Sequence, residues 1–156
     1  YTINPGGPNH EELASLIGIY EYMMELYNHH FNEKVSSTRK KIDKINELFS
    51  NHEEKIANPI LTYLDKRNDI NLIGKNQIIN RGRAPTISFT INKMHSKKIS
   101  KLLVSNKIAT RNDNFYAWRC LDALGIDNED GVIRLSMTHY NSFEDSYKVM
   151  KALDNI

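Results

Sequence analysis

Apolar residues in the first part of the chain recur at helical spacing and predict two long helices. The first extends from about residue 9 to residue 28. Its apolar face is formed by Leu13, Leu16, Ile17, Tyr20, Met24 and Tyr27. Asn9 stands before this run and Glu12 follows three residues later, which is the spacing of a capping box. A second helical pattern extends from about residue 35 to residue 64, with a bend or break expected at Pro59.

The pattern after Asn68 changes to short alternating segments, which predict strands interleaved with helices. We expect strands at residues 70–73, 86–91, 108–111 and 132–138. We expect helices from a cap at Ser96, over residues 115–124 up to Gly125, and over residues 143–153. Short strands separated by single helices predict an α+β fold. It would be a small, mostly antiparallel sheet with helices on one face, preceded by the long helices.

The strand expected at residues 132–138 carries a single arginine. Its apolar set is Ile133, Leu135 and Met137, and the alternate set is Val132, Arg134 and Ser136. Arg134 therefore projects from the face away from the core, where a planar guanidinium can hold a carboxylate through two hydrogen bonds. The pattern alone does not distinguish a ligand-binding arginine from a solvated or salt-bridged one. After the strand, Ser142 and Asp145 form a second capping-box pattern.

The bulk composition is that of an ordinary globular protein. The chain has 156 residues, of which 40% are hydrophobic and 26% charged, enough for one domain with a core. The net charge of +2 gives no strong attraction to nucleic acid or acidic membranes. No apolar run approaches the roughly 20 residues of a membrane-spanning helix, so we expect no membrane partner.

The start of the chain and its cysteine content add further expectations. Residues 1–9 contain neither a basic nor an apolar leader region, so no signal peptide is expected. Tyr1 in place of a methionine fits a processed product or a piece of a longer protein. The single cysteine, Cys120, fits a reducing compartment, and a cytoplasmic location is expected. Because Cys120 falls within a predicted helix beside Trp118, we expect a buried, inert thiol.

Signatures of several common sites are missing from the sequence. There is no Gly-x-Gly-x-x-Gly segment after a strand and no phosphate-binding loop ending in Gly-Lys-Ser/Thr. The histidines do not pair with cysteines or carboxylates at metal-binding spacing. The adjacent His29 and His30 would diverge by about 100° on a helix. We therefore expect neither a metal site nor a nucleotide-binding loop.

Four segments of the chain match the motifs of one protein family in order. They are Gly-Gly-Pro-Asn-His-Glu at 6–11, Arg-Ala-Pro-Thr-Ile-Ser-Phe at 83–89, Ile-Ala-Thr-Arg with Asn-Phe-Tyr-Ala at 108–117, and Gly-Val-Ile-Arg-Leu-Ser with His-Tyr-Asn-Ser at 131–142. Through these segments the chain resembles the pyridoxal-phosphate enzymes of the class V aminotransferase family, in particular its cysteine desulfurase-like branch. The resemblance covers nearly the whole chain.

The resemblance implies a fragment of a larger enzyme. In the family, pyridoxal 5'-phosphate is held as a Schiff base to a lysine of the large domain, and no matching His-Lys segment exists here. Residues 1–33 correspond to a segment and linking helix from the large domain, and residues 34–156 to the C-terminal small domain of a fold-type I enzyme. The parent is expected to be a homodimeric lyase or transferase acting on an amino acid. This chain alone is expected to be inactive and to bind no cofactor.

The resemblance also assigns roles to individual residues. Arg134 matches the arginine that grips the substrate α-carboxylate, and Arg111 a second substrate contact on the active-site loop. Gly7 falls where the family has a threonine that contacts the cofactor phosphate across the dimer interface, and glycine has no hydroxyl for that contact. Tyr116 stands at the position of the catalytic cysteine of true desulfurases, and Cys120 lies four residues too late. Sulfur transfer through a cysteine persulfide is therefore unsupported, and the substrate and reaction type are left open.

Two other classes of function remain open on the sequence. One is a non-catalytic interaction module on the same scaffold, which would explain the missing lysine motif and Gly7. The other is a nucleic-acid binder, which rests on the basic residues between Lys93 and Arg111 and on Arg81-Gly82-Arg83. The balanced net charge disfavours the second of these.

Overall fold

The chain folds into two compact units, residues 1–49 and residues 50–156. The computed structural model describes residues 6–33, 35–80 and 82–156. Residues 1–5, residue 34 and Arg81 of the Arg81-Gly82-Arg83 segment lie outside these ranges. The assignment of residues 1–33 to a large domain stays a prediction. In the described part of the chain, no helix combines the length and apolarity that crossing a membrane requires.

The first unit contains α1 (His10–His30) and the first part of α2 (Thr38–Asp65). The predicted cap is confirmed: the Asn9 side chain accepts a hydrogen bond from the Glu12 backbone N–H at 3.1 Å. Near the end of α1, Tyr27 is buried, and its hydroxyl donates to the Glu33 carbonyl at 3.0 Å. This contact ties the end of the helix to the segment that follows it.

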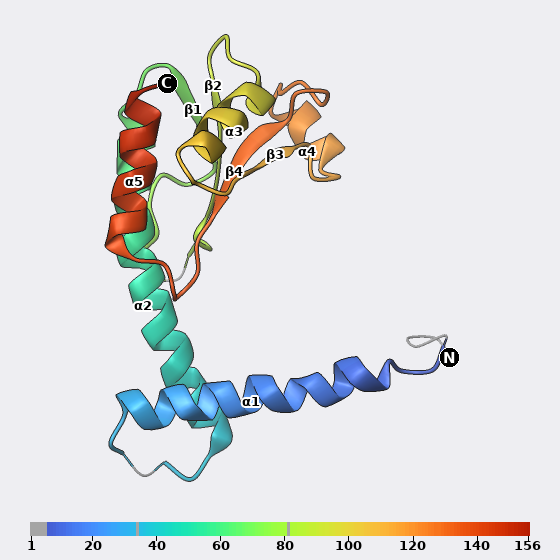
Figure 1. The fold of residues 1–156 in the computed structure, drawn as a ribbon, viewed down its shortest axis with the longest axis vertical. Coiled ribbons are helices and arrows are strands. Elements are labelled where there is room, and N and C mark those ends of the chain that lie inside the picture. The colour runs from blue at the N-terminus through green and yellow to red at the C-terminus, as the bar shows by residue number, and fades with distance from the viewer. Residues whose placement is uncertain (1–5, 34, 81) are drawn as a thin grey trace. The chain divides into compact units, whose positions relative to one another are not determined.

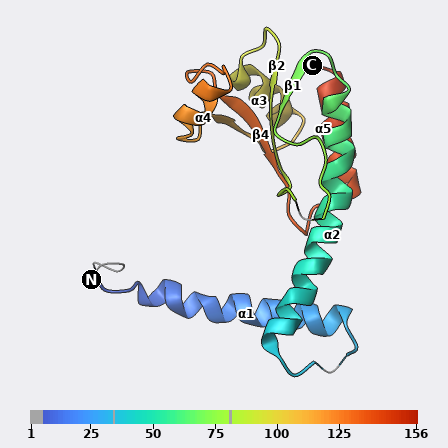
Figure 2. The ribbon, with the colours of Figure 1, turned by 180° about the vertical axis from the view of Figure 1, so that it is seen from behind.

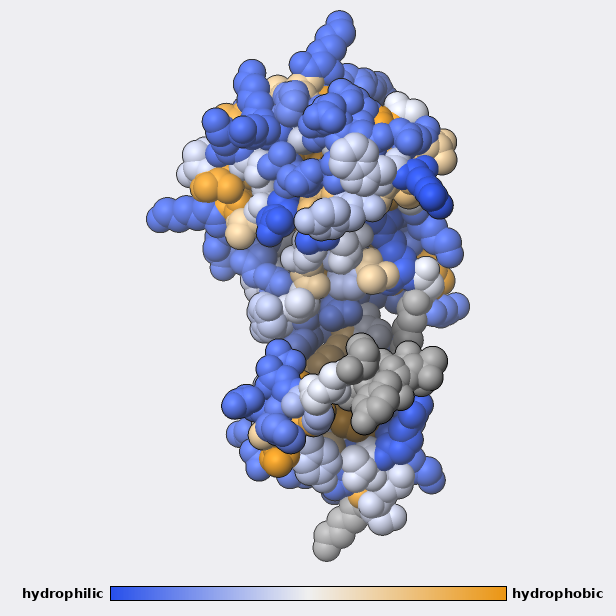
Figure 3. All heavy atoms as spheres, turned by 90° about the vertical axis from the view of Figure 1, so that its right-hand side faces the viewer, coloured by the Kyte–Doolittle hydropathy of each residue, from blue (hydrophilic) through white to orange (hydrophobic). Residues whose placement is uncertain are grey.

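Most of the large apolar side chains of α1 are exposed. The large side chains that are 44–62% exposed on this helix are Leu13, Leu16, Ile17, Ile19, Tyr20 and Tyr22. Figure 3 shows apolar residues (orange) reaching the hydrophilic (blue) surface in several separate places. The periodicity correctly predicts the helix, but burial depends on a partner surface. In the described part of the chain only Tyr27 of this helix is buried.

Helix α2 continues through Pro59, where the sequence predicts a bend or break. Proline removes one backbone hydrogen bond and crowds the preceding turn. On both sides of it, however, the helix is fixed in the core by side chains with no exposed surface: Ile56, Ala57, Ile60 and Leu61. Packing of this apolar face outweighs the local cost of the proline.

The second unit is built on a four-stranded sheet, as predicted (Figures 1 and 2). Its strands are β1 (Ile70–Ile73), β2 (Thr86–Ile91), β3 (Arg111–Asp113) and β4 (Val132–Ser136). They lie in the order β1-β2-β4-β3, and every neighbouring pair is antiparallel. The last strand in the sequence, β4, therefore lies inside the sheet, between β2 and β3.

Three helices of the unit pack on one face of this sheet. Besides α2, the unit contains α3 (Ser96–Ser105), α4 (Trp118–Ala123) and α5 (Phe143–Asp154). The core joins β2 and β4 to three helices through buried residues that include Phe89, Ile133, Leu61, Leu103 and Leu153. Figures 1 and 2, which are opposite views, show α3 in front of the sheet in one and behind it in the other. The predicted α+β architecture is confirmed.

The starts of α3, β3 and α4 differ from the sequence expectation, each for a physical reason that the structure shows. The cap of α3 is His95 rather than Ser96, and the Ser96 backbone N–H donates instead to the Asp130 carboxylate at 2.7 Å. Strand β3 starts at Arg111 rather than at residue 108, because the Ile108 N–H donates to the Leu103 carbonyl and is tied to the end of α3. Helix α4 begins only at Trp118, since the two residues after Asn114 have positive φ.

The capping box predicted at the start of α5 is present and should make stability depend on pH. Ser142 Oγ accepts from the Asp145 N–H at 3.2 Å, and Asp145 Oδ2 accepts from the Ser142 N–H at 2.9 Å. The backbone hydrogen bond from Ser142, followed by the side-chain bond from Asn141, lowers the pKa of Asp145. A lowered folded-state pKa stabilises the fold above the unfolded value of about 4. This contribution is lost as the pH falls through the folded value.

We therefore expect Asp145→Ala to lower the free energy of unfolding by about 1 kcal/mol at pH 7, as for loss of a helix cap. The difference from the unaltered protein should shrink as the pH falls below about 4. Urea denaturation at several pH values measures it. Glu144→Ala is the matched control, since Glu144 lies in the same first turn and makes an exposed ion pair with Lys148. Equal effects of both substitutions at every pH would contradict the capping role.

Candidate functional site

Two arginines lie directly opposite each other on neighbouring strands of the sheet. Arg111 of β3 pairs in register with Arg134 of β4. Directly opposite residues of an antiparallel pair project from the same face. Because Ile133 and Leu135 are buried in the core, Arg134 projects away from it, as its place in the strand predicts. The sequence singled out both arginines, and the structure brings them together.

The two arginines form part of one hollow of about 420 Å³ in the second unit. Its other lining residues lie between the last residue of β3 and the first residue of α4, and three of them are aromatic: Phe115, Tyr116 and Trp118. Such a mixture of guanidinium groups and aromatic rings suits a small organic anion. Asp113 also lines the hollow and supplies the carboxylate present there.

Neither guanidinium has a carboxylate partner among residues 6–33, 35–80 and 82–156. Arg134 instead stacks on an aromatic ring, with its Cζ 4.2 Å from the centroid of Phe115. Its Nε is buried and has no hydrogen-bond partner within the described residues. Like charges directly opposite on a sheet repel each other. A bound anion would relieve this repulsion.

The segment after β3 adopts an unusual backbone conformation. Phe115 and Tyr116 have φ values of 54° and 59°, in the left-handed region that non-glycine residues seldom adopt. Asn114 holds the turn in place: its Oδ1 accepts from the Tyr116 N–H at 3.0 Å, and its Nδ2 donates to the Asn128 carbonyl at 3.3 Å. Left-handed residues of this kind persist where surrounding contacts determine them, often at ligand-binding sites.

Gly131 allows the start of β4 to pass against the base of this segment. It has a φ of 68°, and a Cβ placed on it would lie 2.2 Å from the carbonyl carbon of Asp113 and 2.7 Å from the Asn114 nitrogen. Only a residue without a side chain fits this approach. The glycine therefore sets the spacing between β4 and the segment that carries Phe115.

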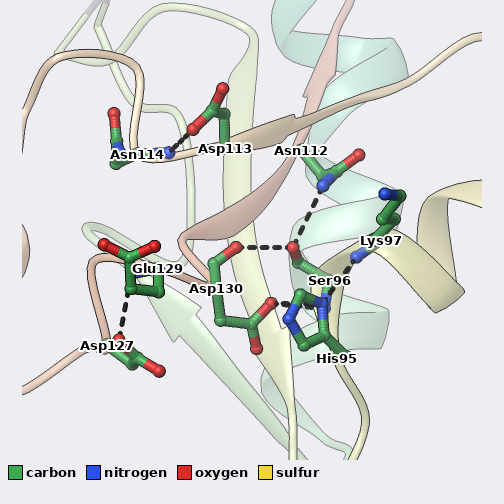
Figure 4. A network of polar contacts seen from close by, with 9 residues as sticks. All are labelled: His95, Ser96, Lys97, Asn112, Asp113, Asn114, Asp127, Glu129 and Asp130. Atoms are coloured by element: carbon green, nitrogen blue, oxygen red, sulfur yellow. Dashed lines mark hydrogen bonds and ion pairs between the residues drawn. The ribbon is translucent and has the colours of Figure 1, made fainter.

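A polar network holds β3 in place on the face of the sheet that the helices cover (Figure 4). Asn112 Nδ2 donates to the Ser96 hydroxyl at 3.2 Å, and that hydroxyl donates to the Asp130 carbonyl at 2.6 Å. His95 Nδ1 lies 2.9 Å from Asp130 Oδ1. In Figure 4 Asn112 turns toward Ser96, while Asp113 turns away from it. The network joins α3, β3 and the turn before β4, so Arg111 stands on an anchored strand.

The remaining residues singled out by the sequence lie in exposed positions. Gly7 is exposed, with no atom within 4 Å of the place a Cβ would occupy. Its cofactor role stays a prediction. Tyr116, at the position of the desulfurase cysteine, is 96% exposed. Cys120 is exposed, and the expectation of a buried thiol is wrong. Helix α4 is short, and Leu121 rather than Cys120 is its buried residue.

The hollow beside the arginines does not fit a Schiff-base cofactor site by itself. None of its lining residues is a lysine. The described ranges also contain no group of three or more metal-binding side chains. Arg111 and Arg134 suit a carboxylate, whereas the group that would carry the cofactor is absent from this hollow.

A second hollow of about 530 Å³ lies on the other side of β4. Leu135 of β4 and Met137, which follows the strand, line it together with Ile60 of α2 and Val149 of α5. Its basic lining residues are Lys107 and Lys148, and no arginine lines it. The paired arginines therefore mark the first hollow as the stronger candidate for an anion.

The sequence is similar to that of a known protein family. The sequence model of the family described as Aminotransferase class-V matches residues 22–149. Over its whole length the chain is 25% identical to the Aminotransferase-like protein FGM3 of Gibberella zeae, and it spans 38% of that protein.

Two different proteins are among the solved structures that share the fold. One is a cysteine desulfurase from Thermococcus onnurineus, with a TM-score of 0.63 and 21% identity over 76% of this chain and 28% of that one. The other is a GDP-4-keto-6-deoxymannose-3-dehydratase with a trapped PLP-glutamate geminal diamine. It has a TM-score of 0.52 and 16% identity over 74% of this chain and 33% of that one. In each case the chain spans well under half of the known protein.

The residues that reasoning from the sequence missed are Phe115 and Gly131 in their structural roles. Phe115 belongs to the Asn-Phe-Tyr-Ala motif, but this motif does not indicate that the Phe115 ring lies over Arg134. Gly131 had a local signal, because a glycine directly before a strand often marks a sharp change of backbone direction. Its close approach to Asp113 depends on the pairing of β3 with β4, which no local pattern contains.

Proposed function

The chain belongs to the aminotransferase class-V family, and from this premise we propose that it is the substrate-binding, C-terminal part of a longer pyridoxal-phosphate enzyme that acts on an amino acid. The observation that carries the proposal is the pair Arg111 and Arg134, opposite each other on the sheet face away from the core and without a carboxylate partner in the described residues. Arg134 would bind the substrate α-carboxylate, and Arg111 would add a second positive charge beside it.

The cofactor would be held by the remainder of the longer protein. The chain spans 38% of its Gibberella zeae relative, which leaves a large part of such a protein for the lysine and the phosphate site. Since no lysine lines the hollow beside the arginines, we assign this chain no chemical step on the cofactor. Its proposed contribution is to bind and orient the substrate. A homodimeric parent and a cytoplasmic location remain predictions.

The reaction class is left at a lyase or transferase of amino acids. A desulfurase that works through a cysteine persulfide would need a thiol at the loop position occupied by Tyr116, whose side chain is 96% exposed. A phenol cannot accept sulfur in that way. Cys120 is exposed, but it lies within α4, beyond the loop. We therefore do not propose sulfur transfer.

Binding of amino acids to the full-length protein tests the proposal. We expect Arg134→Ala to weaken binding of L-alanine and L-cysteine by about thirtyfold, since a two-pronged charged contact is lost. Ethylamine and cysteamine are the matched probes because they lack only the carboxylate, and their binding should be unchanged. Isothermal titration calorimetry gives both dissociation constants. Arg134→Lys should restore only part of the affinity, since an ammonium group lacks the planar fork.

Two results would contradict the proposal. One is equal weakening of the amino acids and the amines, which would show that Arg134 acts on folding and not on the carboxylate. The other is a full-length protein that binds none of these amino acids. That result would favour the alternative, a non-catalytic interaction module on the same scaffold.

A further inference from the structure

We propose that Phe115 is a positioning residue that holds the Arg134 guanidinium flat and directs its free edge toward the substrate carboxylate. This inference rests on the proposed function, because it concerns how the same arginine is made ready to bind. It adds a residue that does not touch the carboxylate itself. Phe115 would act through Arg134.

The first support is the position of the Arg134 Cζ over the Phe115 ring. The Cζ of Arg134 lies 4.2 Å from the centroid of the Phe115 ring, well inside the roughly 6 Å limit for attraction between a cation and an aromatic face. A ring over one face of a guanidinium leaves the edges available, and carboxylates bind along an edge. Stacking therefore restricts rotation of the side chain without competing for the same hydrogen bonds.

The second support is the state of the Arg134 nitrogens. The Nε atom is buried and has no partner among the described residues. Because Nε is closed off from solvent, the accessible edge is the one that carries the two Nη atoms. A carboxylate would then be gripped end-on, through both Nη groups.

The third support is the backbone that presents Phe115. This residue has a φ of 54°, and Tyr116 follows with 59°. Two consecutive left-handed residues that are not glycine cost free energy, so other contacts must stabilise this conformation. Asn114 supplies such contacts from within the segment, and the close approach of Gly131 to Asp113 supplies one from β4. The left-handed conformation brings the Phe115 ring over Arg134. The position of the ring therefore depends on the contacts that hold this backbone conformation.

The test compares two substitutions in the full-length protein. Phe115→Leu keeps an apolar side chain but removes the aromatic face, whereas Phe115→Tyr keeps the face and serves as the matched control. We expect Phe115→Leu to weaken binding of L-alanine and L-cysteine about fivefold and to leave ethylamine and cysteamine unchanged. Phe115→Tyr should bind all four probes as the unaltered protein does. A merely structural role would weaken all four probes alike.

A second measurement reports the position of the guanidinium directly. In an NMR spectrum of protein with ¹⁵N-labelled arginine, the Nε–H signal of Arg134 can be assigned from its loss in Arg134→Ala. The proton of this group should be shifted upfield by the adjacent Phe115 ring. Phe115→Leu should abolish this shift and Phe115→Tyr should keep it. An unshifted signal in the unaltered protein would overturn the proposed stack.

The outcomes separate this inference from the proposed function. If Arg134→Ala weakens amino-acid binding and Phe115→Leu does not, the positioning role is wrong while the proposed function stands. A loss of the ring shift in Phe115→Leu without any change in affinity also overturns the positioning role. If neither substitution changes amino-acid binding, the proposed function fails, and the inference that rests on it fails too.

Discussion

Gly131→Ala should destabilise the second unit by about 3 to 5 kcal/mol, near the upper end for a single substitution. An added Cβ would lie 2.2 Å and 2.4 Å from the carbonyl carbon and oxygen of Asp113. Those atoms belong to backbone paired with β4, so they cannot rotate aside as a flexible side chain would. The glycine also has a φ of 68°, which adds strain for an L-residue. Urea denaturation followed by circular dichroism measures the loss.

Gly125→Ala separates the close contact from the backbone strain. Gly125 also has a φ of 68°, but no atom lies within 4 Å of the place its Cβ would occupy. We expect it to cost only about 1 kcal/mol, the penalty for a left-handed L-residue. If the two alanine substitutions cost the same, the close packing of Gly131 on Asp113 has no energetic effect.

Phe89→Ala should lower the free energy of unfolding by about 4 kcal/mol. Phe89 has no exposed surface and lies on the inner strand β2, in register with Leu72 of β1 and Ile133 of β4. Truncation removes its apolar contacts and leaves a cavity that the sheet and the covering helices cannot close. Thermal and urea denaturation both report this loss.

Phe143→Ala is the matched control for the same chemical change. Phe143 is 57% exposed at the start of α5, where its ring lies 6.3 Å from that of His52. We expect a cost below about 1 kcal/mol, as for most surface substitutions. A loss as large as that of Phe89→Ala would show that the core is not centred on β2.

Local patterns were enough to predict the parts of the fold that depend on neighbouring residues. The alternation around Arg134 correctly placed it on the face away from the core, because period two in a strand is set by backbone geometry. The capping box of Ser142 and Asp145 was predicted for the same reason, since all its groups lie within one turn. The two long helices followed from spacing alone.

Features that depend on distant contacts were predicted less well. The helix through Pro59 and the exposed Cys120 both depend on which faces find a packing partner. At the site, Arg111 was named through the family resemblance, but its register with Arg134 requires the pairing of β3 with β4. The stack of Phe115 requires that pairing and a left-handed backbone as well.

Strand β3 is short and lies at one edge of the sheet. It has three residues, and its charged Arg111 and Asp113 are exposed. A short edge strand with exposed charges offers few free backbone groups to a strand of another molecule, which protects against edge-to-edge aggregation. The positive charge of Arg111, which we propose contacts the substrate, thus also discourages pairing of another strand at this edge of the sheet. Replacing Arg111 with an apolar residue would therefore have a cost in solubility as well as in binding.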